Sequence, residues 1–170
     1  ERMIFGKSLN AGQICVAPDY VLLPRGQEQA FIEAYQAHFR RLYPKGLDSP
    51  DYGSIINAAQ YERLTAWLAE AKQAGAQVHP CASPARDDGA RRLVPHLLTE
   101  VPGHCQLMQQ EIFGPLLPLV PYDSIEEAIA YVAARPRPLA LYLMSLDPAL
   151  QHRLIRETHA GGMAINECLF

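Results

Sequence analysis

A cysteine near the start of the sequence is the residue best suited to act as a nucleophile. Cys15 follows Asn10-Ala11-Gly12-Gln13-Ile14 and precedes a short apolar run that is typical of a buried strand. A glycine at this place permits tight turning and close backbone approach. A thiol held there could attack a carbonyl carbon while neighbouring backbone amides stabilise the oxyanion. From the residues alone, the alternative is that Cys15 is a small buried apolar side chain.

The remaining cysteines and the histidines show no spacing that carries chemistry. They form neither a CxxC pair nor an HxxxH pair, and the chain is large enough to fold without disulfide staples. We therefore predict no disulfide framework and no metal site, and we interpret the other three cysteines as structural. The residues concerned are Cys81, Cys105, Cys168, His38, His79, His96, His104, His152 and His159.

A second motif, Gln110-Glu111-Ile112-Phe113-Gly114-Pro115, lies about a hundred residues after Cys15. A carboxylate can accept two charge-assisted hydrogen bonds, as from hydroxyls on neighbouring ribose carbons. Taken alone, Glu111 is a solvated carboxylate before a turn, and Phe113 before Gly-Pro is a core residue. Only a second, independent feature favours a binding role for either.

The composition places these motifs in an ordinary globular domain. The chain has 170 residues, 49% hydrophobic and 19% charged, with a net charge of -3. A net charge of this sign and size does not favour electrostatic binding to nucleic acid or to an anionic membrane surface. No run approaches the ~18 apolar residues of a membrane span, and no signal-peptide pattern opens the chain, so we expect a cytoplasmic location.

Apolar periodicity and turn residues predict alternating helices and strands. Strands are expected where short apolar runs end at Pro or Gly, and helices are expected where apolar residues recur at intervals of three and four residues. The expected strands are 20–23, 76–79, 93–98, 116–120, 139–144 and 163–165; the expected helices are 27–43, 58–74, 123–135 and 147–158. Residues 80–92 are expected to be a hairpin tip or an exposed connection. This order predicts an α/β fold around one core, with a largely parallel sheet flanked by helices and apolar strands buried on both faces.

These motifs together resemble the NAD(P)-dependent aldehyde dehydrogenases. Gly6-Lys7, Asn10, Gly12-Gln13, Cys15 and Val16-Ala17-Pro18-Asp19-Tyr20 are similar to the family's nucleophile segment, in particular that of its class 3 and coniferyl aldehyde dehydrogenase branch. The second motif resembles the family's EIFGP segment. The stretches GSIINAAQYERL (53–64), RPLALYLMS (137–145) and GGMAIN (161–166) follow the family's order, so the resemblance covers nearly the whole chain.

The resemblance implies a role for five residues. Cys15 matches the nucleophile, Glu111 the carboxylate that binds the ribose hydroxyls of NAD or NADP, and Phe113 the aromatic placed against the nicotinamide. Gln60 matches a further cofactor contact, and Asn166 a residue that lines the substrate pocket near the cysteine. The implied reaction oxidises a small-molecule aldehyde, coniferyl or another aromatic aldehyde being a candidate, to the carboxylic acid through a thiohemiacetal and a thioester.

The resemblance also implies how the chain is organised. The first residue is Glu1 rather than Met and the last, Phe170, follows an apolar run. We therefore expect residues 1–170 to be one catalytic domain of a longer homo-oligomeric enzyme. The dinucleotide-binding domain, the general-base glutamate and the oxyanion-hole asparagine are expected before residue 1, and a subunit-pairing segment after residue 170. By itself the chain is expected to bind NAD or NADP poorly and to oxidise no aldehyde.

Two other functional interpretations remain. One is a non-catalytic module or degenerate homologue that keeps the fold without its chemistry. The joint presence of Cys15 and Glu111 favours the enzyme over this module. The other is a thiol-dependent hydrolase, which no histidine in a matching motif supports.

Overall fold

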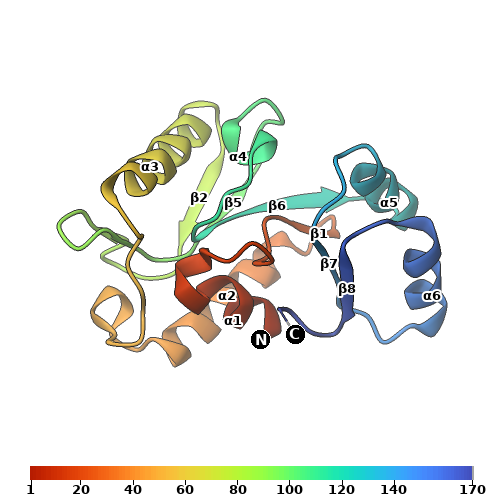
Figure 1. Ribbon diagram of the computed structural model, residues 1–170, viewed down its shortest axis with the longest axis horizontal. Helices are drawn as coiled ribbons and strands as arrows, with labels where there is room; N and C mark the ends of the chain where they lie inside the picture. Colours follow the sequence, from red (N-terminus) through yellow and green to blue (C-terminus); the bar gives the residue numbers. More distant parts are fainter. Residues whose placement is uncertain (170) are drawn as a thin grey trace.

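A four-stranded sheet forms the centre of the larger part of the molecule (Figure 1). The structure is a computed structural model that describes residues 1–169. The strand order is β1-β6-β5-β2, where β1–β6 and β6–β5 pair parallel and β5–β2 pair antiparallel. The strands are β1 (Val21–Pro24), β2 (Gln77–Pro80), β5 (His96–Thr99) and β6 (Leu116–Tyr122). The predicted α/β fold with a largely parallel sheet is confirmed.

A second, two-stranded parallel sheet lies in a smaller unit beside the first (Figure 1). Its elements are α5 (Ile125–Ala133), β7 (Ala140–Leu143), α6 (Pro148–Glu157) and β8 (Gly162–Ile165). The expectation that β7 is buried on both faces is wrong for the described residues. Three of its four residues are only half-buried, and the preceding Leu139 is 61% exposed. An apolar run identifies a strand, but which neighbours cover its faces depends on tertiary packing.

Three of the four long helices among residues 1–169 begin at a residue whose side chain accepts a hydrogen bond from the first turn. In α3 (Ala58–Gln73) the Asn57 side chain accepts a hydrogen bond from the Gln60 amide, and Gly75 follows the helix with a φ of 103°. Ser124 caps α5 and Asp147 caps α6 in the same way. With α2 (Glu28–Leu42), all four predicted helices are confirmed to within about two residues of their predicted bounds.

Several short elements were not predicted. They are too short to show an apolar period, so tertiary contacts determine them. They are α1 (Arg2–Ser8), η1 (Leu9–Gly12), η2 (Gly46–Asp48) and α4 (Gln106–Gln109). Residues 80–92 include most of a short hairpin, whose strands are β3 (Arg86–Asp87) and β4 (Arg92–Leu93). Of the two predictions for this segment, the hairpin tip is therefore the correct one.

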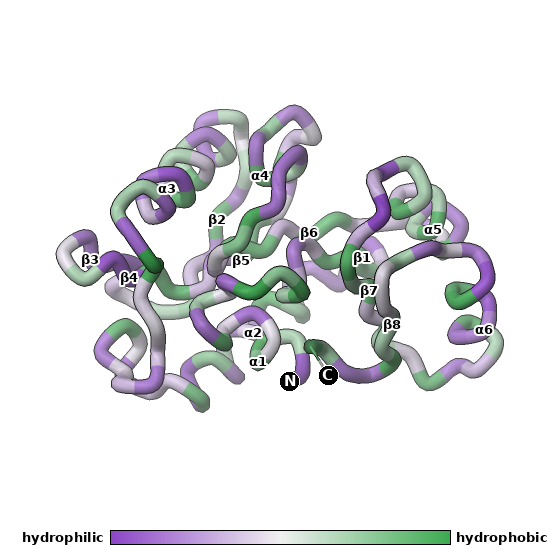
Figure 2. Tube along the Cα trace, in the orientation of Figure 1, coloured by the Kyte–Doolittle hydropathy of each residue, from purple (hydrophilic) through white to green (hydrophobic). Residues whose placement is uncertain are grey.

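The main core fixes the relative position of two loops. Hydrophobic residues concentrate along β5 and β6 (Figure 2), and the side chains of Leu97, Leu98, Leu116 and Leu117 are fully buried there. Because β1 and β6 are parallel neighbours, the segments that lead into them lie at the same edge of the sheet. One segment carries Cys15 and the other carries Glu111 and Phe113.

Two glycines with a positive φ give a matched test of this packing. Gly12 has a φ of 75°, and a Cβ there would lie 2.5 Å from the Gly114 carbonyl oxygen. Gly26 has a φ of 88°, but a Cβ there meets no atom of the described residues within 4 Å. We expect Gly26→Ala to lower the free energy of unfolding by about 1–2 kcal/mol through backbone strain alone, and Gly12→Ala by about 2–5 kcal/mol, since overpacking is added.

Urea unfolding of both variants measures this difference. Equal losses for Gly12→Ala and Gly26→Ala would contradict the close approach of Gly12 to Gly114.

Candidate active site

The Cys15 side chain is exposed in a turn that ends before β1. The turn is closed by a hydrogen bond of 2.9 Å from the Ala17 amide to the Ile14 carbonyl. Cys15 is the exposed member of four free cysteines, so the interpretation of Cys15 as a buried apolar residue is wrong. Burial raises the pKa of Cys81 to about 12 and that of Cys168 to about 11. Cys15 is therefore the thiol that solvent and substrate can reach.

A left-handed stretch of backbone precedes the cysteine. Asn10, Ala11 and Gly12 have φ values of 50°, 52° and 75°. Such a conformation costs about 1–2 kcal/mol for a residue with a Cβ, so the surroundings must hold it in place. The buried Gln13 side chain does so, because it donates to the Asn10 and Ser54 carbonyls at 2.9 and 3.1 Å and accepts from the Ile56 amide at 2.9 Å. The loop is thereby fixed to the segment that leads into α3.

The second motif packs directly between this loop and α3. The Gly12 backbone touches Gly114, and a Cβ on Gly114 would lie 2.5 Å from the Leu64 side chain. Gly114 is therefore required for close approach, and Gly12 both for close approach and for its positive φ. As a result, the backbone of the Cys15 loop and that of the second motif are in contact, although about a hundred residues separate them in the sequence.

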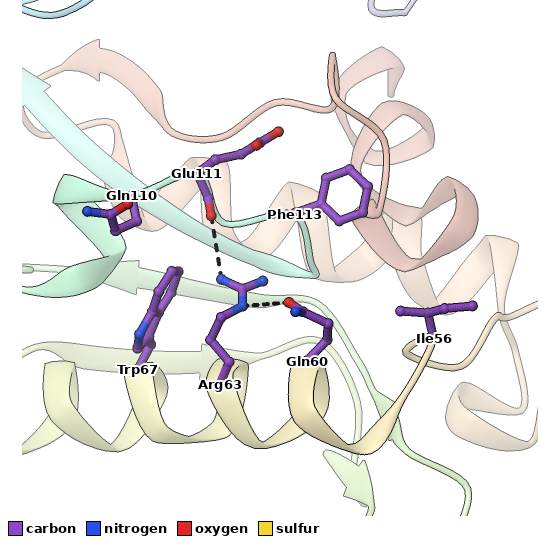
Figure 3. A pocket seen from close by; sticks show the side chains of 7 residues that line it. All are labelled: Ile56, Gln60, Arg63, Trp67, Gln110, Glu111 and Phe113. Carbon is purple, nitrogen blue, oxygen red and sulfur yellow. Dashed lines mark hydrogen bonds between the residues drawn. The ribbon is translucent and has the colours of Figure 1, made fainter.

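An open hollow of about 550 Å³ lies between α3 and this second loop (Figure 3). It brings together three of the sequence-predicted site residues, Gln60, Glu111 and Phe113. Cys15 and Asn166 are not among the residues that line it. The lining residues are Ile56, Gln60, Arg63, Trp67, Gln110, Glu111 and Phe113. Trp67 is half-buried, packs against the main core and also forms part of this wall.

The Glu111 side chain offers a free carboxylate beside an aromatic ring. Glu111 is exposed, and no ion pair joins its carboxylate to a cation within residues 1–169. Figure 3 shows the carboxylate directed away from Arg63, although Arg63 lies close to the Glu111 carbonyl. Phe113 is 38% exposed and has a φ of 46°. A free carboxylate and an exposed ring suit a ligand with neighbouring hydroxyls and a planar group.

Arg63 holds the loop through its main chain. Its guanidinium donates to the Ile112 carbonyl at 2.6 Å, to the Glu111 carbonyl at 3.5 Å and to the Gln60 side-chain oxygen at 2.7 Å. It also lies 4.3 Å from the centre of the Trp67 ring, a cation–π distance. Burial lowers its pKa, while the charges of Glu111 and Asp19 oppose that shift.

Two charged residues that lie next to the second loop, the buried Lys7 and the half-buried Asp19, were missed as site residues. Lys7 is 1% exposed, and burial lowers its pKa to about 8 against the charges of Asp19 and Glu111. Burial raises the pKa of Asp19, and Lys7 opposes that rise. The Asp19 carboxylate accepts a hydrogen bond of 3.0 Å from the Ile112 amide. Both residues stand inside the nucleophile motif, but only the tertiary structure brings them to the second loop.

Asn166 takes part in the pairing of the second sheet. Its backbone has a φ of 58°, and its side chain accepts from the Ser145 amide and donates to the Ser145 carbonyl, both at 2.9 Å. The Tyr142 hydroxyl on β7 donates to the Val16 carbonyl at 2.7 Å, which ties this sheet to the Cys15 loop. Asn166 thus belongs to a unit that is hydrogen-bonded to the Cys15 loop, and it does not line the hollow that contains Glu111.

The described residues carry no other group of chemical interest for a metal or a membrane. Within residues 1–169, no three His, Cys, Asp or Glu side chains come together as a metal-binding set. In the same range, no helix is long and apolar enough to cross a bilayer.

Comparison with known proteins gives consistent matches over almost the entire chain. The sequence model of the aldehyde dehydrogenase family matches residues 1–169. The chain is 47% identical to a probable coniferyl aldehyde dehydrogenase of Pseudomonas aeruginosa and 43% identical to a 4,4'-diaponeurosporen-aldehyde dehydrogenase of Staphylococcus aureus, in each case over 99% of its length. A solved structure of the substrate-bound state of Staphylococcus aureus AldH superimposes with a TM-score of 0.89 and 42% identity over 99% of the chain. The chain spans 35% and 36% of the two relatives and 36% of the solved structure.

Proposed function

This chain belongs to the aldehyde dehydrogenase family, and from that premise we propose that it is the cysteine-bearing catalytic domain of a longer enzyme that oxidises an aldehyde to a carboxylic acid. One observation carries the proposal. The exposed Cys15 is held at the same sheet edge as a loop that presents a free carboxylate and an aromatic ring to an open hollow. A degenerate copy has no chemical reason to keep this set of side chains.

In the proposed mechanism Cys15 acts twice. Its thiolate attacks the carbonyl carbon of the aldehyde to give a thiohemiacetal in its alkoxide form, which backbone amides can stabilise and whose oxygen re-forms the C=O bond when hydride leaves. NAD or NADP, when bound, accepts the hydride that leaves this carbon. The carbon remains on the Cys15 sulfur as a thioester, which water hydrolyses to the carboxylic acid and the free thiol. A thiol suits both steps because it is a strong nucleophile and a good leaving group.

The residues of the hollow fit the proposed cofactor. The Glu111 carboxylate can accept both hydroxyls of the nicotinamide ribose, and the exposed Phe113 ring can support the nicotinamide. The Gln60 oxygen is already bonded to Arg63, so the Gln60 side chain has its NH₂ group left to donate. For Asn166, a place in the substrate pocket beside Cys15 stays a prediction.

The relatives' names support an aromatic substrate as the first to test. The Pseudomonas aeruginosa relative is named for coniferyl aldehyde and the Staphylococcus aureus relative for 4,4'-diaponeurosporen-aldehyde. We propose coniferyl aldehyde or a similar aromatic aldehyde as substrate, with NAD and NADP assayed in parallel. Assembly into a homo-oligomer and a cytoplasmic location stay predictions from the resemblance.

Alkylation of the full-length protein tests this proposal. With limiting iodoacetamide, we expect Cys15 to be modified first, since the other three cysteines are buried and burial raises the pKa of each. Aldehyde-dependent formation of NADH or NADPH should fall in proportion to the modified fraction of Cys15 found by peptide mapping.

Three outcomes would contradict it. Labelling of Cys81, Cys105 or Cys168 before Cys15 in the folded protein would remove the chemical basis of the nucleophile. Undiminished aldehyde oxidation by fully modified protein would exclude Cys15 from the reaction. Protein that never reduces NAD or NADP with any aldehyde would favour the non-catalytic module.

A further inference from the structure

We propose that Arg63 and Asp19 are positioning residues that grip the main chain of the Glu111–Phe113 loop from two sides and so keep the Glu111 carboxylate free for the cofactor. This inference rests on the proposed function. Neither residue needs to touch the cofactor or the aldehyde.

Arg63 supplies the first side of the grip. Three of its five N–H groups face acceptors, and the Glu111 and Ile112 carbonyls are two of these acceptors. A guanidinium next to a glutamate would ordinarily form an ion pair with its carboxylate. Here the loop turns carbonyls toward Arg63 and the carboxylate away from it (Figure 3). Arg63 therefore binds the main chain of the loop without forming an ion pair with the Glu111 carboxylate.

The guanidinium itself is held in place by α3. Gln60 and Trp67 stand one turn before and one turn after Arg63 on the helix, and both contact it. An arginine braced in this way has lost its rotational freedom before a ligand arrives. It therefore acts as a rigid link between α3 and the loop.

Asp19 supplies the second side. Its carboxylate accepts the hydrogen bond from the Ile112 amide at 3.0 Å, so the carbonyl and the amide of Ile112 are both taken. Asp19 lies four residues after Cys15 and is half-buried, and the positive charge of Lys7 opposes the rise that burial causes in its pKa. Through Ile112 the cysteine segment and α3 thus hold the same residue, which sets the distance between the nucleophile and the cofactor loop.

The test compares cofactor and aldehyde kinetics in the full-length enzyme. Arg63→Met keeps the aliphatic length and removes the donors, whereas Arg63→Lys keeps the charge but not the fork. Arg153→Met is the matched control, because within residues 1–169 Arg153 forms ion pairs only with Glu126 and Glu157, on the surface of the smaller unit. We expect Arg63→Met to raise the KM for the cofactor about 10- to 100-fold, with the KM for the aldehyde changed less than about threefold. Arg63→Lys should recover only part of the loss, and Arg153→Met should behave as wild type.

A second pair of variants tests the other side of the grip. Asp19→Asn keeps an oxygen that can accept from the Ile112 amide, and Asp19→Ala does not. We expect the KM for the cofactor to rise more in Asp19→Ala than in Asp19→Asn, because only the alanine leaves the amide unpaired. The rate of Cys15 alkylation without cofactor reports whether the cysteine loop itself has moved, and in Arg63→Met it should match wild type.

The outcomes separate the two proposals. If wild-type enzyme reduces neither NAD nor NADP, the proposed function fails. If wild type is active and Glu111→Gln weakens cofactor binding while Arg63→Met does not, the grip is wrong and the proposed function stands. Equal rises in the KM for cofactor and aldehyde in Arg63→Met, with slower Cys15 alkylation, would likewise overturn the grip, since they would indicate general disruption.

Discussion

Replacing Cys15 by serine in the full-length enzyme is expected to reduce aldehyde oxidation by about a thousandfold or more, which corresponds to at least about 4 kcal/mol of transition-state stabilisation. A serine hydroxyl has a far higher pKa than a thiol, so it attacks the aldehyde poorly at neutral pH. It is also the poorer leaving group, so any acyl ester that forms is hydrolysed slowly. The measurement is steady-state turnover together with a burst experiment on the first reduced cofactor.

The position of Cys15 in the fold indicates that its replacement should not disturb folding. Cys15 is exposed in a turn, and serine differs from cysteine by one atom, so the free energy of unfolding should stay within about 0.5 kcal/mol of wild type. Cys15→Ala is the companion variant, because it removes the nucleophile without offering another. Turnover near the wild-type value in either variant would mean that Cys15 is not the nucleophile.

Glu111→Gln should fail in a different way. The amide keeps the shape of the side chain but removes the charge, and we expect the binding of NAD or NADP to weaken by about 1–3 kcal/mol, roughly 5- to 150-fold in Kd. A ribose held less firmly also misplaces the nicotinamide, so hydride transfer should slow. Titration of the cofactor by calorimetry and single-turnover kinetics measure the two effects separately.

Glu62→Gln is the matched control for this change. Glu62 is also an exposed glutamate and lies on α3, but it does not line the hollow. It should leave cofactor affinity unchanged. If Glu111→Gln were equally silent in both measurements, Glu111 would be the solvated carboxylate that the isolated sequence also permits.

Much of the secondary structure is determined locally and was predictable. A helix such as α3 has an apolar face of regular period, an Asn57 cap and a terminating Gly75, and all of these lie within about twenty residues. Strand β6 is an apolar run bounded by prolines, although it continues through Pro121 to Tyr122 where the sequence suggested an end at Val120. Its pairing with β1 puts residues about a hundred positions apart in register, which local patterns do not encode.

In the candidate site, too, some features can be predicted from the sequence and others depend on the tertiary structure. Residue type and position single out Cys15 as a candidate nucleophile, whereas the roles of Glu111, Phe113 and Gln60 come from the family resemblance. Their arrangement depends on groups whose importance is invisible in sequence. Only when the chain folds do the charges of Lys7 and Asp19 influence each other, and only then does the Arg63 guanidinium donate to main-chain carbonyls of the second loop.

The sequence by itself determined the family resemblance, the α/β order of elements and the identity of the chemically competent side chains, since these follow from residue types and short-range periodicity. The tertiary structure decided that Cys15 is exposed, that the Glu111 carboxylate stays free of Arg63, and that Asn166 pairs with Ser145. The physical reason is that exposure, charge pairing and hydrogen-bond partners depend on contacts between segments far apart in the chain. Such contacts depend on how all the segments at the edge of the sheet pack together. The local sequence around a single residue does not determine them.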